Sequence, residues 1–146
     1  NNDGNGGLMA ESLNHITYVR RIVEYAKDIP SAFIPNCLLA DLPDFPERPI
    51  ATLDGYIPDV LYNDSHTIII GEAKTIRDIE NDHTERQINS YIDEVRCHKG
   101  TRHIVICSNA LSFSHIKNMI VRKKMRENIS DISFHILDNI YKVAVI

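Results

Sequence analysis

The sequence predicts an α/β domain in which helices cover both faces of a mixed β-sheet. Three observations lead to this class: a β-hairpin signal in the first half of the chain, a strand–helix–strand alternation after it, and helical segments before and after the hairpin. A hairpin joins antiparallel strands, whereas a strand–helix–strand crossover joins parallel strands. A single sheet that contains both connections is therefore mixed.

The chain has 146 residues, of which 43% are hydrophobic and 25% are charged, as in an ordinary globular domain. We assign residues 1–10, which begin with the Asn- and Gly-rich run NNDGNGG, to a flexible N-terminal tail. Residues 11–146 are assigned to a single domain.

Cysteine content and hydropathy indicate which cellular compartment is expected for the protein. Cys37, Cys97 and Cys107 show no Cys-x-x-Cys spacing, which argues against a disulfide framework or a four-cysteine zinc site. A reducing, cytoplasmic localisation is expected. The longest apolar runs are too short to span a bilayer, so no membrane association is expected.

The first predicted element is a helix over residues 12–28. Its apolar residues recur at helical spacing, and Pro30 ends the pattern. The next segment, residues 30–49, is rich in proline and predicts a long loop.

Strand signals begin near residue 50. Residues 56–62 and 67–75 are apolar runs joined by Asn63-Asp64-Ser65-His66, which predicts a β-hairpin. The remaining pattern predicts a helix, a buried parallel strand, a second helix and two final strands: residues 84–99, 102–108, 113–128, 132–137 and 141–146.

Charged residues stand where the hairpin is otherwise apolar. Glu72 and Lys74 are two apart on one strand and therefore project to the same face, with Ala73 turned the other way. Asp59, on the partner strand, is expected beside Glu72. Two adjacent carboxylates repel each other, and a cation that prefers oxygen ligands, Mg²⁺ or Mn²⁺, would relieve that repulsion. The ammonium group of Lys74 could then act on an attacking water or on a phosphate.

Pro58-Asp59 and Glu72-Ala73-Lys74 resemble the PD-(D/E)xK motif of the restriction-endonuclease-like nuclease superfamily. The resemblance implies a restriction-endonuclease-like mixed sheet flanked by helices and magnesium-dependent hydrolysis of phosphodiester bonds. It also implies that Asp59, Glu72 and the Ala73 carbonyl bind the metal, and that Lys74 positions and polarises the water. Product ends would be 5′-phosphate and 3′-hydroxyl.

A second motif lies on the helix that follows. Gln87 and Tyr91 are one turn apart on one helix face and resemble the Q-x-x-x-Y motif of RecB-type nuclease domains. The resemblance implies that they support the site or contact the phosphate backbone. Members of the superfamily also place an acid or a histidine on the first helix as an extra ligand. Helical phase favours Glu11 for this role, with His15 as the alternative.

The expected function is that of a magnesium- or manganese-dependent nuclease, with DNA preferred over RNA as substrate, acting as a homodimer or as part of a longer polypeptide. The net charge of −4 argues against a large polyanion-binding surface, and the basic run at residues 121–126 is interpreted as a solvated helix face. Two alternatives stay open. One is a catalytically inactive nuclease-fold module for nucleic-acid binding or assembly, and the other is a structural protein whose charges form ion pairs.

Overall fold

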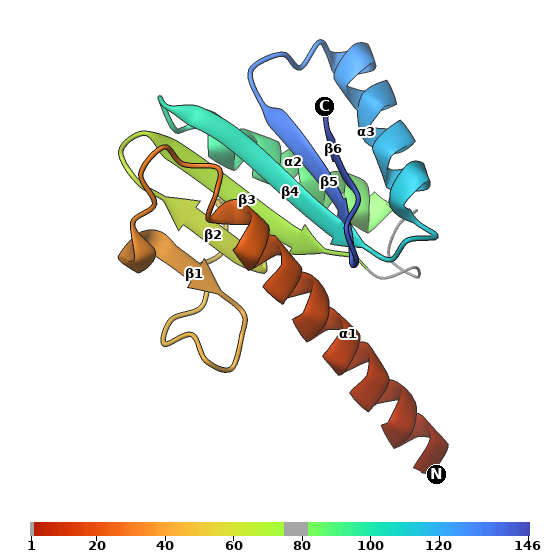
Figure 1. The fold of residues 1–146 in the computed structure, drawn as a ribbon. Coiled ribbons are helices and arrows are strands. Elements are labelled where there is room, and N and C mark those ends of the chain that lie inside the picture. The colour runs from red at the N-terminus through yellow and green to blue at the C-terminus, as the bar shows by residue number, and fades with distance from the viewer. Residues whose placement is uncertain (1, 75–81) are drawn as a thin grey trace.

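The computed structural model describes residues 2–74 and 82–146, and the side chains of residues 13–74 and 82–146. These residues form a six-stranded mixed sheet flanked by three α-helices, which confirms the predicted α/β class (Figure 1). The elements follow in this order: α1 (Asn2–Ala26), the 3₁₀ helix η1 (Pro35–Cys37), β1 (Leu38–Ala40), β2 (Val60–Asn63), β3 (Thr67–Ala73), α2 (Asp82–Arg96), β4 (Thr101–Ser108), α3 (Phe113–Glu127), β5 (Ser133–Asp138) and β6 (Val143–Val145). Within this part of the chain, no helix combines the length and the apolarity that crossing a bilayer requires.

The strands lie side by side in their order along the chain, from β1 to β6. Strands β1, β2 and β3 are antiparallel neighbours, β3, β4 and β5 are parallel, and β6 returns antiparallel to β5. Both predicted connections are therefore present in one sheet. In the hairpin Val60 pairs with Gly71, and this register brings Asp59, the residue before Val60, next to Glu72.

The core has two layers because the strands alternate their side chains between the two faces of the sheet. Helix α1 covers one face, where Val19, Ile22 and Val23 pack against Ile69 and Val105. Helices α2 and α3 cover the opposite face (Figure 1). A large part of the apolar residues on that second face are isoleucines: Ile68, Ile70, Ile88, Ile92, Ile104, Ile106, Ile116, Ile120 and Ile136.

Helix α1 is longer than the sequence pattern indicates. It begins at Asn2 and so runs through the segment for which a flexible tail is predicted. Its N-terminal half extends beyond the edge of the sheet (Figure 1). The segment contains no proline, and a helix already formed on the sheet adds one hydrogen bond for each further residue.

Strand β1 is the element that the sequence pattern misses. Leu38, Leu39 and Ala40 pair with β2 inside a segment predicted to be a loop. A strand of three residues between prolines is too short to show an alternating pattern. Its pairing with Val60, Leu61 and Tyr62 determines its conformation, and this long-range contact is not visible in the local sequence.

Gly71 lies where the hairpin and α1 approach most closely. A Cβ atom at this position would lie 2.6 Å from Ile22 Cγ2 and 3.0 Å from Val60 Cβ. We expect Gly71→Ala to lower the free energy of unfolding by about 1–3 kcal/mol through overpacking, measured by chemical denaturation. If the clash is the cause, the variant that also carries Ile22→Ala will lose less stability than the two single changes added together.

Tyr25 and His135 join α1 to β5. The Tyr25 hydroxyl lies 2.6 Å from His135 Nδ1, and His135 Nε2 lies 2.9 Å from His103 Nδ1. Burial, and then the neighbouring His103, lower the pKa of His135 from 6.5 to about 4. The folded protein therefore resists protonation of this ring, and the stability that it contributes is fully present above pH 6.5 and lost as the pH falls through about 4.

We expect the free energy of unfolding to fall more steeply between pH 7 and pH 4.5 in the wild type than in His135→Gln, by roughly 2 kcal/mol over this range. Denaturant titrations at a series of pH values measure the difference. Equal slopes for wild type and His135→Gln would show that His135 titrates normally.

Candidate functional site

The three motif residues meet where the hairpin and α2 come together. Asp59 immediately precedes β2, Glu72 lies in β3 and Lys74 directly follows it. The Asp59 N–H donates to Glu72 Oε2 at 3.3 Å, and the Ala73 N–H donates to Asp59 Oδ2 at 2.8 Å. The Lys74 N–H donates to the Cys107 carbonyl of β4 at 2.8 Å. The backbone of the hairpin therefore holds all three side chains in place.

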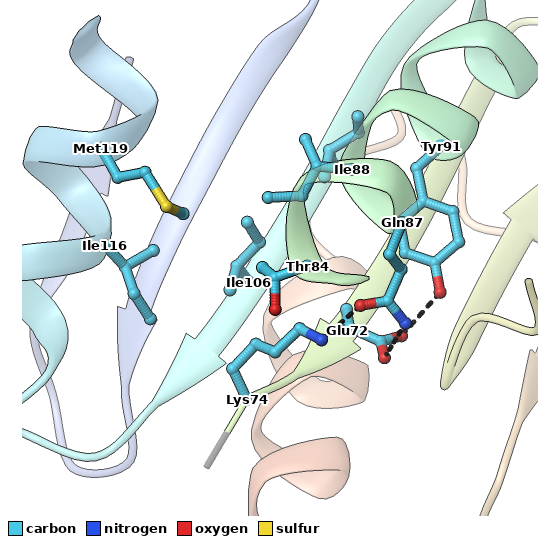
Figure 2. A pocket seen from close by; sticks show the side chains of 10 residues that line it. Glu72, Lys74, Thr84, Gln87, Ile88, Tyr91, Ile106, Ile116 and Met119 are labelled. Atoms are coloured by element: carbon cyan, nitrogen blue, oxygen red, sulfur yellow. Dashed lines mark hydrogen bonds between the residues drawn. The ribbon is translucent and has the colours of Figure 1, made fainter. Parts of the chain in front are cut away.

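Helix α2 completes a hydrogen-bonded chain around Glu72 (Figure 2). Gln87 Nε2 donates to Glu72 Oε1 at 2.8 Å, and the Tyr91 hydroxyl donates to Glu72 Oε2 at 3.0 Å. Lys74 Nζ donates to Gln87 Oε1. Glu72, Lys74, Gln87 and Tyr91 are all buried. Gln87 therefore connects the carboxylate and the ammonium group of the predicted motif, which shows that the two sequence motifs form one cluster.

The segment before Asp59 is also attached to α2. The Thr52 and Ser90 hydroxyls lie 2.7 Å apart, and both side chains are buried. The Tyr56 ring packs on His83 at the start of α2. These contacts hold the segment that precedes Asp59 against α2. The Asp59 carboxylate is therefore held in place both by the hairpin and by this segment.

The electrostatics of the cluster are those of a buried acid pair. Burial raises the pKa of Glu72, the Asp59 carboxylate raises it further, and the Lys74 ammonium opposes both. Burial, followed by the Glu72 charge, likewise raises the pKa of Tyr91. The Tyr91 hydroxyl is therefore a hydrogen-bond donor rather than an acid. An added cation or a proton would relieve the repulsion between the two carboxylates.

On the α1 side of the sheet, His15 and Asp41 approach Asp59. His15 Nε2 lies 3.3 Å from Asp59 Oδ1 and 3.7 Å from Asp41 Oδ2. The Asp41 N–H donates to the Asp59 carbonyl at 2.8 Å, which fixes the two backbones together. The hydrogen bond with Asp59 is the largest effect raising the pKa of His15.

One group of donors in the described part of the chain is close enough together to bind a divalent cation. One ligand atom each from His15, Asp41 and Asp59 lie within 4.8 Å of one another. Two carboxylates with one imidazole suit Mn²⁺ and also accept Mg²⁺. Both oxygens of Glu72, in contrast, already accept hydrogen bonds from Gln87, Tyr91 and the Asp59 backbone.

The sequence-predicted ligands are placed as follows. Asp59 and Glu72 are adjacent, and Ala73 turns into the α1 side of the core, as the strand alternation predicts. The side chain of Glu11, the preferred third acid, lies outside the described residues. His15, the alternative, is beside Asp59. Sequence reasoning missed Asp41, since only the pairing of β1 with β2 brings it to the site.

The basic run of α3 is not a solvated face throughout. Lys123 is buried, and its Nζ donates to Glu85, Asn89 and Glu127 at 2.6–2.7 Å. Arg126 also lies near Glu85 and Glu127, at 3.7 and 3.4 Å. These two cations connect α2 to α3 and are neutralised within the protein, so they leave little positive charge for a polyanion.

Comparisons with protein-family models, with curated proteins and with solved structures give no match for this chain.

Proposed function

We propose that the protein is a metal-dependent nuclease of the PD-(D/E)xK type that hydrolyses phosphodiester bonds, with DNA preferred over RNA. The observation that carries the proposal is the buried hydrogen-bonded chain from Glu72 through Gln87 to Lys74, with Asp59 and Tyr91 attached to Glu72. Burying two acids and a lysine costs free energy. An ion-pair network that served stability alone would not need a glutamine between the acid and the lysine.

The metal would be Mg²⁺ or Mn²⁺, bound by Asp59, His15 and Asp41. Glu72 lies next to this group and accepts a hydrogen bond from the Asp59 N–H. When bound, such a cation acts as a Lewis acid toward a phosphate oxygen and lowers the pKa of a coordinated water. Asp59 is the natural centre of this group. Its Oδ2 is fixed by the Ala73 N–H, while its Oδ1 faces His15.

The other site residues orient the reacting groups and stabilise charge. Gln87 holds the Lys74 ammonium in one place, so that it can orient the attacking water or stabilise negative charge on the phosphate. Tyr91 and Gln87 keep the Glu72 carboxylate fixed. Because these groups are ordered before substrate arrives, little reorganisation remains for the reaction itself.

The direct test is a cleavage assay with purified protein on linear, circular, single-stranded and branched DNA and on RNA. We expect hydrolysis of DNA with Mg²⁺ or Mn²⁺ and none with excess chelator, and 5′-phosphate and 3′-hydroxyl ends on the products. If no substrate is cleaved with either metal, the proposal is wrong.

Two observations favour a second candidate, a nuclease-fold module that binds or assembles without cutting. The net charge is −4, and Arg48 Nε lies 3.5 Å from Asp41 Oδ1, where it partly neutralises the acid group. Calorimetry with Mn²⁺ separates the two candidates, because a retired site would have no reason to bind a cation.

We expect Mn²⁺ to bind, and Asp41→Asn to weaken that binding by roughly tenfold, the effect of losing about 1.4 kcal/mol. Asp44→Asn is the matched control, since Asp44 pairs with Arg20 away from the site. Absence of Mn²⁺ binding to the wild type would favour the inactive module. Unchanged affinity in Asp41→Asn would remove Asp41 from the ligand set.

The reducing cytoplasm is the proposed location of this activity. Cys37, Cys97 and Cys107 are all free thiols, which fits a compartment in which disulfides are rare. A homodimer, or a longer polypeptide that contains this domain, would supply the additional contacts with nucleic acid that an acidic domain of this size needs.

A further inference from the structure

A cleft of about 790 Å³ opens at the end of the sheet opposite Lys74. It lies where β3 and β4 begin, and three separate segments form its wall: residues 29–31 after α1, residues 65–67 in the hairpin and residues 99–103 before and within β4. The residues that line it are Ile29, Ser31, Ser65, His66, Thr67, Lys99, Gly100, Thr101 and His103.

Hydrogen bonds fix the wall of the cleft. The Thr101 N–H donates to the His66 carbonyl at 2.9 Å, and the Gly100 N–H donates to His98 Nδ1 at 2.8 Å. His98 Nε2 in turn lies 2.6 Å from the Asp64 carbonyl. A Cβ atom on Gly100 would lie 2.1 Å from the His66 carbonyl oxygen, so only glycine permits this close approach. The cleft is therefore formed before any ligand arrives.

The side chains that line the cleft are rich in hydrogen-bond donors. Lys99 supplies an ammonium group, His66 and His103 supply imidazoles, and Ser31 and Ser65 supply hydroxyls beside those of two threonines. The described lining contains no carboxylate. Thr67 Oγ1 and Thr101 Oγ1 lie 3.0 Å apart. Such a surface suits a ligand that carries negative charge and several acceptor oxygens.

The histidine chain behind the cleft gives His103 a defined role. His103 Nδ1 is occupied by His135 Nε2, and His135 Nδ1 is occupied by the Tyr25 hydroxyl. If Tyr25 donates to His135, then His135 Nε2–H donates to His103 Nδ1, and both nitrogens of the His135 ring are paired. The proton of His103 must then be on Nε2. In this arrangement the Nε2–H group of His103, a residue that lines the cleft, is a hydrogen-bond donor.

We propose that this cleft binds the phosphate group of a small phosphorylated ligand of nucleotide size, with Lys99 and His103 as its principal contacts. A volume near 790 Å³ lies within the range of small-molecule sites. Ile29, beside the polar lining, offers an apolar contact for the remainder of such a ligand. The site does not depend on the proposed nuclease function, because Thr67 and Lys74 are separated by about 20 Å along the strand direction.

The test is a titration of the ¹⁵N-labelled full chain at constant ionic strength, followed by NMR, with inorganic phosphate, thymidine 5′-monophosphate and thymidine. We expect saturable shifts at the amides of Thr67, Gly100 and Thr101 and at the His103 ring with the monophosphate. Inorganic phosphate should give weaker binding with shifts at the same residues, and thymidine should give none. Lys99→Met should weaken monophosphate binding about tenfold or more.

Two variants serve as controls. Lys117→Met makes the same change on α3, away from the cleft, and Asp59→Asn alters the proposed nuclease site alone; both should bind the monophosphate like the wild type. Absence of saturable shifts at the cleft, equal binding of thymidine, or unchanged affinity in Lys99→Met would overturn the proposal. Shifts centred on Glu72 and Lys74 instead would mean that the nucleotide binds at the nuclease site, which also contradicts it.

Discussion

Asp59→Asn is expected to lower metal-dependent DNA cleavage by about 10³-fold or more, the range seen when a member of a reacting constellation is removed. Asparagine keeps an oxygen that can accept the Ala73 N–H now bonded to Oδ2. The substitution removes the negative charge that faces His15 and therefore the group on which the proposed cation site is centred. Initial rates with Mg²⁺ and with Mn²⁺, at saturating metal for the wild type, measure the loss.

The same variant should fold at least as well as the wild type. Asp59 is one of the causes of the raised pKa of Glu72, which means that the two buried carboxylates repel each other. Replacing one of them by a neutral amide removes that repulsion. The expected pattern, lost activity with a maintained or increased free energy of unfolding, is typical of a site where function opposes stability.

Asp44→Asn makes the same chemical change at a carboxylate that pairs with Arg20 on the surface. It should leave the cleavage rate unchanged. If Asp59→Asn cleaves as fast as the wild type, Asp59 does not act in the reaction. If Asp59→Asn is inactive because it is unfolded, the metal affinity of Asp41→Asn is measured instead. The Asp41 side chain is about 40% exposed, so this substitution disturbs the fold less.

The order of helices and strands could be predicted because its signals are local. Apolar spacing and the polar turn at residues 63–66 each lie within or beside the element that they specify. Gly100 is a weaker signal, because α2 ends at Arg96 and not at residue 99 as expected. Strand β1 could not be predicted in this way. Its conformation depends on pairing with β2, some twenty residues later in the chain. The start of α1 at Asn2 is likewise not marked by an apolar pattern, since the first turns of the helix contain Asn and Gly.

The same distinction between local signals and long-range contacts applies to the residues of the candidate site. Strand alternation predicts that Asp59, Glu72 and Lys74 lie together, and resemblance to the Q-x-x-x-Y motif adds Gln87 and Tyr91. The structure joins all five. Asp41 depends on β1, so no local pattern could place it beside Asp59. The buried position of Lys123 also follows from contacts between helices, with Glu85 and Asn89 on α2. Within a basic run, a buried lysine cannot be distinguished from its exposed neighbours by sequence alone.

Lys74→Met is expected to reduce cleavage by roughly 10²–10⁴-fold. The free energy of unfolding should also fall, by about 1–3 kcal/mol, because the buried Gln87 Oε1 loses its donor. Methionine is close to lysine in length and fits the buried position, which is 7% exposed. The change removes the ammonium that Gln87 holds, and with it the group proposed to orient the water and stabilise charge on the phosphate. Gln87 keeps its bond to Glu72, so the acid side of the cluster stays in place.

Lys123→Met is the matched control because Lys123 is the other buried lysine among the described residues, at 2% exposure. Its loss removes the nearer of the two cations that Glu85 and Glu127 share, and Arg126 stays beside both glutamates. Both glutamates are partly exposed, so the free energy of unfolding should fall by only about 1–2 kcal/mol. Cleavage at 25 °C should not change. The two variants thus separate a lysine held for chemistry from one held for packing: if Lys74→Met loses stability and keeps activity, as Lys123→Met should, then Lys74 has a structural role and the proposed mechanism is wrong.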